Sequence, residues 1–206
     1  MEYFVGIDPS MNSTGLCIQK YEGNKKVHED FFIIKPSTNK LTKKEKLAEE
    51  QCDKFKYVFY EADDLKLYND NNLFHEYWKT YNMVRLVTKI KEVIGEYTKG
   101  RRKQIHIVIE GISYGSMSRT KSIFDLAGLN YMIRNYFIEK DDITFWIVPP
   151  SEIKKFTTGN GAANKESMIH LFEASHPELS IIPKIDDIAD AYFMSCYSKE
   201  LYEKWS

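Results

Sequence analysis

Two largely apolar runs that each end in a carboxylate constrain the fold of this chain more than any other feature. The first run is Tyr3–Ile7, followed by Asp8, and the second is Ile105–Ile109, followed by Glu110. Short runs rich in β-branched and aromatic residues are typical of buried strands. A carboxylate at the end of such a strand points into the crevice where sites form in open α/β sheets. Both runs therefore predict strands that deliver an acid to a functional site.

Two more acids lie on a predicted helix near the end of the sequence. Asp187 and Asp190 are three residues apart, so they share one helix face, and Asp186 is expected to be the N-cap. Carboxylates brought together repel each other unless a hard cation neutralises them, and a ligand set made only of oxygen suits Mg²⁺ or Mn²⁺. With Asp8 and Glu110, these acids predict a metal-dependent enzyme that acts on phosphates.

The order of the predicted elements indicates an α/β fold built on a mixed sheet. Strands are predicted at 2–8, 15–21, 27–34, 104–110 and 143–148, and helices at 73–97, 122–138, 151–156, 164–174 and 186–202. We expect a single domain over residues 1–206. Residues 36–72 are expected to form an exposed helical insertion followed by a loop, because 40–56 is dense in Lys and Glu.

Composition narrows the class of protein. A hydrophobic fraction of 43% is enough for a core, and no apolar run is long enough to span a membrane. No secretory signal is expected, because no basic segment leads into an apolar stretch at the N-terminus. The cysteines Cys17, Cys52 and Cys196 are widely separated, which predicts free thiols in the cytoplasm of a bacterial cell or a phage-infected host. A net charge of −1 does not indicate DNA binding, although a basic face can coexist with an acidic metal site.

Three blocks of the sequence resemble the RuvC-type Holliday junction resolvases of the ribonuclease H-like superfamily. The segment Gly6–Gly15 reads Gly-Ile-Asp-Pro-Ser-x-x-Ser-Thr-Gly, like the first hairpin of ribonuclease H-like enzymes. Residues Val148–Lys165 resemble the Pro-x-x-Val-Lys…Gly-x-Gly-x-Ala-x-Lys stretch of the resolvases, and Asp186–Ala191 resembles their closing Asp-x-x-Asp-Ala helix. The first block also opens actin-like ATPases, so the combination of blocks carries the resemblance, which covers residues 3–35 and 104–198.

The resemblance implies a fold, an activity and a cofactor. The fold would be a ribonuclease H-like mixed sheet of five strands flanked by helices. The activity would be that of a crossover junction endodeoxyribonuclease, which resolves Holliday junctions by paired nicks that leave 5′-phosphate and 3′-hydroxyl ends. Two Mg²⁺ ions, with Mn²⁺ as a substitute, would be held by the carboxylates Asp8, Glu110, Asp187 and Asp190.

The resemblance also implies contacts with the DNA backbone. The candidate residues are Ser10, Asn12, Ser13, Tyr114, Lys154, Lys155, Gly159, Gly161 and Lys165. Tyr114 is the nearest candidate for the aromatic wedge that the family places after its second-strand glutamate, although its register differs and it is equally suited to packing. The three lysines are also compatible with an ordinary solvated face. The segment 36–72 has no counterpart that we can align with the compact resolvases.

A homodimer is expected because a four-way junction has two-fold symmetry and its resolution needs two opposed nicks. The predicted contact surface combines helices 122–138 and 73–97. Its candidate anchors are Phe124, Tyr131, Tyr136 and Phe137. The alternative is that these aromatic residues fill the core of the monomer.

Other functions remain open at this point. A broader nuclease that cuts flaps, forks or single strands would use the same carboxylates. An actin-like ATPase would need a second phosphate-binding hairpin, which we do not find in the sequence. A catalytically inactive DNA-binding subunit would have little use for all four acids.

Overall fold

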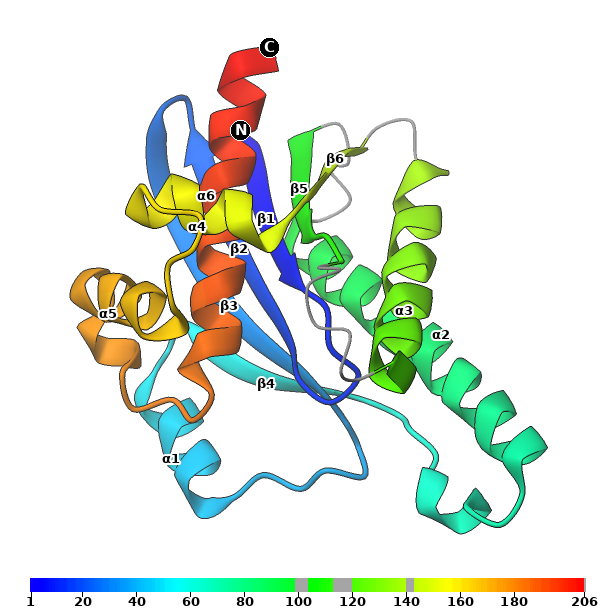
Figure 1. The fold of residues 1–206 in the computed structure, drawn as a ribbon. Helices are drawn as coiled ribbons and strands as arrows, with labels where there is room; N and C mark the ends of the chain where they lie inside the picture. Colours follow the sequence, from blue (N-terminus) through cyan, green and yellow to red (C-terminus); the bar gives the residue numbers. More distant parts are fainter. Residues whose placement is uncertain (99–103, 113–119, 140–142, 206) are drawn as a thin grey trace.

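Helices and strands cover most of the chain (Figure 1). The structure, a computed structural model, describes residues 1–98, 104–112, 120–139 and 143–205. In chain order the elements are β1 (Glu2–Asp8), β2 (Thr14–Glu22), β3 (Lys25–Pro36), α1 (Lys43–Gln51), β4 (Phe55–Tyr60), the 3₁₀ helix η1 (Leu65–Tyr68), α2 (Asn72–Thr98), β5 (Ile105–Glu110), α3 (Thr120–Ile138), β6 (Ile143–Val148), α4 (Pro150–Thr158), α5 (Lys165–Ser175), the 3₁₀ helix η4 (Pro177–Leu179) and α6 (Ile185–Trp205).

A mixed sheet organises the described residues. Its strand order is β4-β3-β2-β1-β5-β6. Within it, β2 runs antiparallel to both of its neighbours, whereas β1, β3, β4, β5 and β6 share one direction. Because β1 and β5 are adjacent and parallel, Asp8 and Glu110 at their ends lie on the same edge of the sheet. We call this the carboxyl edge, and it is the lower edge in Figure 1.

Helices cover both faces of the sheet (Figure 1). On one face, α2 and α3 pack over a core that includes Ile7, Leu86 and Leu129. On the other face lies α6, with α1, α4 and α5 around it, over a core that includes Phe31 and Phe172. Burial on both faces explains why the strands read as nearly continuous apolar runs. The predicted α/β class with a mixed, helix-flanked sheet is confirmed.

The prediction for residues 36–72 was wrong in part. The predicted helix is present as α1, but Phe55–Tyr60 forms strand β4, which pairs in parallel with β3. Phe55 and Tyr57 are buried, so this segment belongs to the core rather than to an exposed insertion. The sheet in the described residues therefore has six strands instead of the five predicted. A buried ion pair between Lys35 and Glu45, at 2.7 Å, ties α1 to β3.

The described part of the chain contains no helix with the length and apolar character needed to cross a membrane. Cys17 and Cys52 are buried, Cys196 is partly exposed, and all three are free thiols.

Candidate active site

The main chain of α6 lies directly against β1 and β2. A Cβ atom at Gly6 would lie 1.9 Å from the carbonyl oxygen of Ala191, and a Cβ atom at Gly15 would lie 2.1 Å from the carbonyl oxygen of Asp187. Real Cβ atoms do not approach other atoms so closely, so only glycine allows the helix to rest on these strands. This close contact, which we call the glycine seam, places the acidic first turns of α6 beside the end of β1.

The four predicted carboxylates come together at the carboxyl edge. Asp8 comes from β1, Glu110 from β5, and Asp187 and Asp190 from α6. Each is partly exposed to solvent. Asp8 interacts electrostatically with all three of the others, and its carboxyl group lies within hydrogen-bonding reach of Glu110. The edge therefore carries a cluster of acids that is accessible from outside.

Burial and mutual repulsion raise the pKa values of these acids. Burial, followed by repulsion from Glu110, raises the pKa of Asp8 well above its usual range. Burial and then Asp190 raise the pKa of Glu110 to about 7, and burial is the main cause that raises the pKa of Asp190 to about 6. Burial also raises the pKa of Asp187, and a hydrogen bond from Ser13 opposes this increase. A cluster that resists ionisation in this way favours a bound cation.

Neighbouring polar residues already engage part of the cluster. The Ser13 hydroxyl is buried and donates a hydrogen bond to Asp187 Oδ2. Lys165 pairs with Asp186, which lies in the first turn of α6 rather than at the predicted N-cap, because the helix begins at Ile185. The positive charges of Lys154 and Lys165 both favour the ionised form of Glu110. These two lysines therefore lie close enough to the carboxylates to act on them electrostatically.

The donor set fits a hard cation by its chemistry, because it consists of carboxylate oxygens. In their present positions, however, no three or more His, Cys, Asp or Glu side chains of the described residues form a group that could hold a metal ion. The acids instead engage their neighbours, as in the hydrogen bond from Ser13 to Asp187 and the contact between Asp8 and Glu110. Binding a cation therefore requires these side chains to turn toward the ion, from main-chain positions that the sheet and the glycine seam fix.

Two of the other residues predicted to contact DNA, Ser10 and Asn12, lie in the loop after β1. Ser10 closes the loop after β1, because its N–H donates to Thr14 Oγ1 and its carbonyl oxygen accepts from the same hydroxyl. Asn12 is exposed in that loop, one residue before Ser13. Tyr114 lies outside the described residues. The predicted contact of Ser10 and Asn12 with the DNA backbone stays a prediction.

The segment after β6 holds the remaining predicted contacts. Lys155 lines a groove together with Ser151, Gly161 and Lys204, whereas the charge of Lys154 acts on Glu110 and favours its ionised form. Gly159 ends α4 in the left-handed conformation, with φ at 77°, and its N–H donates to the Lys155 carbonyl oxygen at 2.9 Å. Helix termination therefore accounts for glycine at this position without DNA.

One residue next to the site was not predicted from the sequence. Asn130 of α3 is 1% exposed, and its Nδ2 donates to the carbonyl oxygen of Glu110 at 2.6 Å. Arg134, one turn later, donates to Asn130 Oδ1. An asparagine within a helix, between apolar residues that face the core, was the available signal, because asparagine is a poor helix former.

The comparisons with known proteins agree with this arrangement at the level of the fold. No protein-family model matches the chain, and no curated protein matches it by sequence. Among solved structures, Thermus thermophilus RuvC is 14% identical, with a TM-score of 0.51 over 98% of this chain and 95% of that one. The fold is that of the RuvC-type resolvases.

Two further solved structures support the same conclusion. T. thermophilus RuvC in complex with a Holliday junction substrate is 14% identical, with a TM-score of 0.51 over 99% of this chain and 96% of that one. The yeast mitochondrial Holliday junction resolvase is 13% identical, with a TM-score of 0.50 over 97% of this chain and 80% of that one. The RuvC-like fold thus extends over nearly the whole chain.

Proposed function

We propose that this protein is a Mg²⁺-dependent, structure-selective endodeoxyribonuclease that nicks branched DNA, with the four-way junction as its substrate. The observation that carries the proposal is the convergence of four carboxylates at the carboxyl edge of a RuvC-type fold. Repulsion within such a cluster opposes folding, and strongly perturbed acids in one place are typical of functional sites. A broader nuclease for flaps, forks or single strands is the alternative that the same carboxylates allow.

The side chains of Asp8, Glu110, Asp187 and Asp190 would hold two Mg²⁺ ions, for which Mn²⁺ is expected to substitute. When bound, Mg²⁺ supplies an activated water and stabilises the leaving oxygen of phosphodiester hydrolysis. The carboxyl groups would release their protons on becoming ligands, and the hydrogen bond from Ser13 favours the ionised form of Asp187. The ammonium groups of Lys154 on α4 and Lys165 on α5 add positive charge that suits a backbone phosphate.

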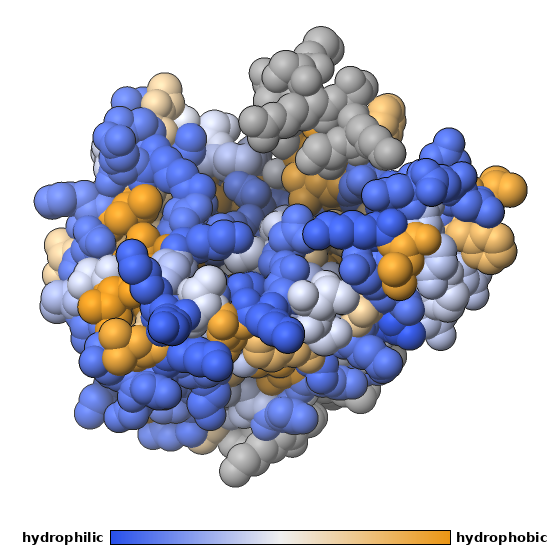
Figure 2. All heavy atoms as spheres, turned by 90° about the horizontal axis from the view of Figure 1, so that it is seen from below, coloured by the Kyte–Doolittle hydropathy of each residue, from blue (hydrophilic) through white to orange (hydrophobic). Residues whose placement is uncertain are grey.

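The carboxyl edge itself suits a polar ligand. Figure 2 views the molecule from below, and hydrophilic residues dominate this face, with hydrophobic residues in separate patches. Such a surface favours a charged, hydrated partner such as DNA, because interfaces with DNA are more polar than those between proteins. Lys154 and Lys165 would contact the phosphates next to the scissile one, whereas Lys155 would contact DNA farther away.

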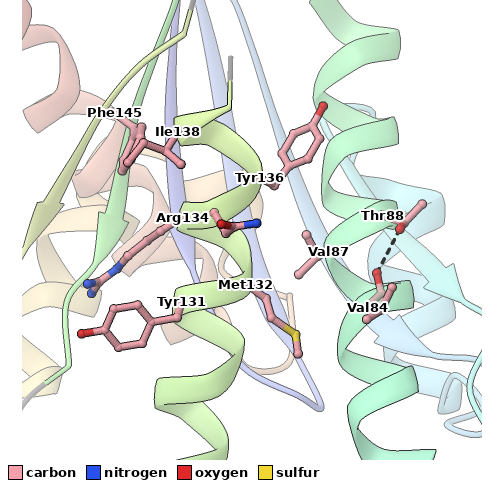
Figure 3. A pocket seen from close by; sticks show the side chains of 10 residues that line it. Val84, Val87, Thr88, Tyr131, Met132, Arg134, Tyr136, Ile138 and Phe145 are labelled. Carbon is pink, nitrogen blue, oxygen red and sulfur yellow. Dashed lines mark hydrogen bonds between the residues drawn. The ribbon is translucent and has the colours of Figure 1, made fainter. Parts of the chain in front are cut away.

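A groove between α2 and α3 supports the proposed homodimer. It has a volume of about 840 Å³ and is lined largely by apolar side chains, among them Val84 and Tyr131 (Figure 3). Phe124 and Tyr131 are 72% and 62% exposed, and exposed apolar surface marks association sites. Phe137, in contrast, is 2% exposed and belongs to the monomer core, so it is not available as an anchor. Two copies joined here would present paired sites to a two-fold symmetric junction.

The cleavage test uses labelled duplex, flap, fork and four-way substrates of matched sequence, each incubated with Mg²⁺. We expect the wild-type protein to nick the four-way junction in preference to the duplex, and we expect Asp8→Asn to bind the junction without cutting it. Asp70→Asn, at an exposed position before α2, is the matched control and should retain activity. Full activity of Asp8→Asn would refute the metal-site assignment, and preferential flap cutting would favour the broader nuclease.

Sedimentation at micromolar concentration tests the dimer. We expect a dimer both free and on a four-way junction, and we expect Tyr131→Lys to dissociate it by placing a charge in the groove. Leu171→Lys, at a 41% exposed position on α5, is the control and should leave the dimer intact. A wild-type protein that is monomeric in both states would remove the dimer and favour cleavage by single nicks.

A further inference from the structure

The peptide group that follows Glu110 is held from both sides. The N–H of Gly111 donates to the carbonyl oxygen of Val148 at 2.7 Å, on the β6 side. The carbonyl of Glu110, which belongs to the same peptide group and points the opposite way, accepts from Asn130 Nδ2 at 2.6 Å. The pairing of β1 with β5 ends one residue before Glu110, so this carbonyl has left the β1 ladder. Asn130 therefore takes the place of the next strand partner.

Asn130 is itself fixed in one orientation. Its Oδ1 accepts from Arg134 Nε at 2.6 Å, so the amide must turn its nitrogen toward Glu110. The guanidinium of Arg134 lies 4.7 Å from the centre of the Tyr131 ring, and Figure 3 shows these two side chains together on α3. The hydrogen bonds from Arg134 to Asn130 and from Asn130 to Glu110 form a chain that starts on a partly exposed side chain and ends at the main chain of a candidate metal ligand.

We infer that Asn130 is a positioning residue, which orients Glu110 by fixing the end of β5. Arg134 in turn holds Asn130 in place. The inference rests on the proposed nuclease function. A buried amide is costly unless it is hydrogen-bonded, and packing alone would be served by leucine at this position. Without Asn130 the end of β5 would be held only from the β6 side, and a twist at Glu110 would redirect its carboxylate. Groups that orient a metal ligand typically change metal affinity or activity by about 10- to 100-fold when they are removed.

The substitution Asn130→Asp removes one of the two bonds selectively. The aspartate keeps an oxygen acceptor for Arg134 but presents a second oxygen, instead of a donor, to the carbonyl of Glu110. The matched control is Asn82→Asp. Asn82 is 4% exposed on α2, and its Nδ2 donates to the carbonyl oxygen of Asp63 at 3.0 Å, with no contact to the carboxylates. Both variants thus lose one buried hydrogen bond from an amide to a main-chain carbonyl. In Asn130→Asp the lost bond holds the end of β5 at Glu110, whereas in Asn82→Asp it holds the loop at Asp63.

Four measurements on the protein decide the matter. We expect Asn130→Asp to lower the single-turnover cleavage rate by about 10- to 100-fold, to raise the Mg²⁺ concentration for half-maximal rate, and to leave junction affinity in Ca²⁺ within about twofold. Hydrogen exchange of residues 105–112 should become faster in this variant. Asn82→Asp should leave the rate, the Mg²⁺ dependence and this exchange unchanged.

A second variant tests the inference independently, in case Asn130→Asp does not fold. Arg134→Met keeps the length of the side chain, removes the donor to Asn130, and should lower the rate several-fold and speed the exchange of residues 105–112. Because Arg134 also lines the groove between α2 and α3, the exchange is compared with that of Tyr131→Lys, in which the donor to Asn130 is kept. Wild-type rate, Mg²⁺ dependence and exchange in Asn130→Asp would overturn the inference, as would equal losses in Asn82→Asp. If the wild-type protein cut none of the DNA substrates, the proposed function would fail, whereas the exchange of 105–112 would still show whether Asn130 fixes the end of β5.

Discussion

The substitution Gly15→Ala tests whether the glycine seam positions the proposed catalytic acids. The new Cβ would lie 2.1 Å from the carbonyl oxygen of Asp187 and 3.5 Å from the Cβ of Ala191. Since ordinary contact begins at 3.4 Å, the start of α6 must retreat from β2 by roughly 1 Å, and a shift of this size at a reacting group costs about 100-fold in rate. Overpacking of this kind costs about 1–3 kcal/mol, and the stiffer unfolded chain offsets about 0.4–1 kcal/mol of it, so we expect a net destabilisation of about 1 kcal/mol.

Urea unfolding followed by far-UV circular dichroism measures the stability, and single-turnover cleavage of a four-way junction measures the rate. Gly95→Ala is the control, because Gly95 lies inside α2 and a Cβ added there would meet no atom within 4 Å, and alanine should stabilise the helix by about 0.5–1 kcal/mol without altering cleavage. A Gly15→Ala protein with wild-type stability and rate would refute the role of the seam. Destabilisation without a loss of rate would show that the seam supports folding but does not position Asp187.

Three further predictions concern ions and charge. Replacing Lys154 and Lys165 with alanine should weaken binding to all DNA alike and lower the slope of log K against log salt by about 2, as measured by fluorescence anisotropy, and an unchanged slope would show that these lysines only face solvent. Ca²⁺ should support junction binding without cleavage, because its looser geometry misplaces the attacking water, and rapid cleavage in Ca²⁺ would argue against two-metal hydrolysis. Burial raises the pKa of Glu29, but hydrogen bonds from His176 and Lys26 outweigh burial and lower it to about 2 from an ordinary 4.5. The contribution of Glu29 to stability, about 3 kcal/mol, should be complete above about pH 4.5 and lost as the pH falls toward 2, and Glu29→Gln should remove that part of the pH dependence of unfolding.

The sequence predicted the elements that carry the acids because their signals are local. The strands that end at Asp8 and Glu110 are buried on both faces, which leaves a nearly unbroken apolar run in each. The spacing of Asp187 and Asp190 places both on one helix face wherever the helix packs. Parallel pairing of β1 with β5 then brings the acids to one edge.

The features that the sequence did not predict depend on tertiary contacts. Strand β4 carries a local strand signal, since Phe55–Tyr60 holds four aromatic residues and a valine, but its place beside β3 at the edge of the sheet depends on tertiary contacts. The ion pair of Lys35 with Glu45 shows that a charge of the segment rich in Lys and Glu is itself buried. The role of Asn130 cannot be predicted before α3 is placed beside the end of β5, because its hydrogen-bond partner, Glu110, lies 20 residues earlier in the chain.

The glycine seam has a consequence for how such a chain can diverge. At Gly6 and Gly15 the spacing between strand and helix is set by main-chain atoms, which every sequence shares, and no side chain lies between them to be repacked. Substitutions elsewhere in the core can therefore accumulate without changing how far Asp187 stands from β2. A fold shared with RuvC at 14% identity is the outcome expected of such an arrangement. In a saturation-mutagenesis library selected for cleavage, tolerance should be wide across the apolar core and should narrow sharply at these two glycines.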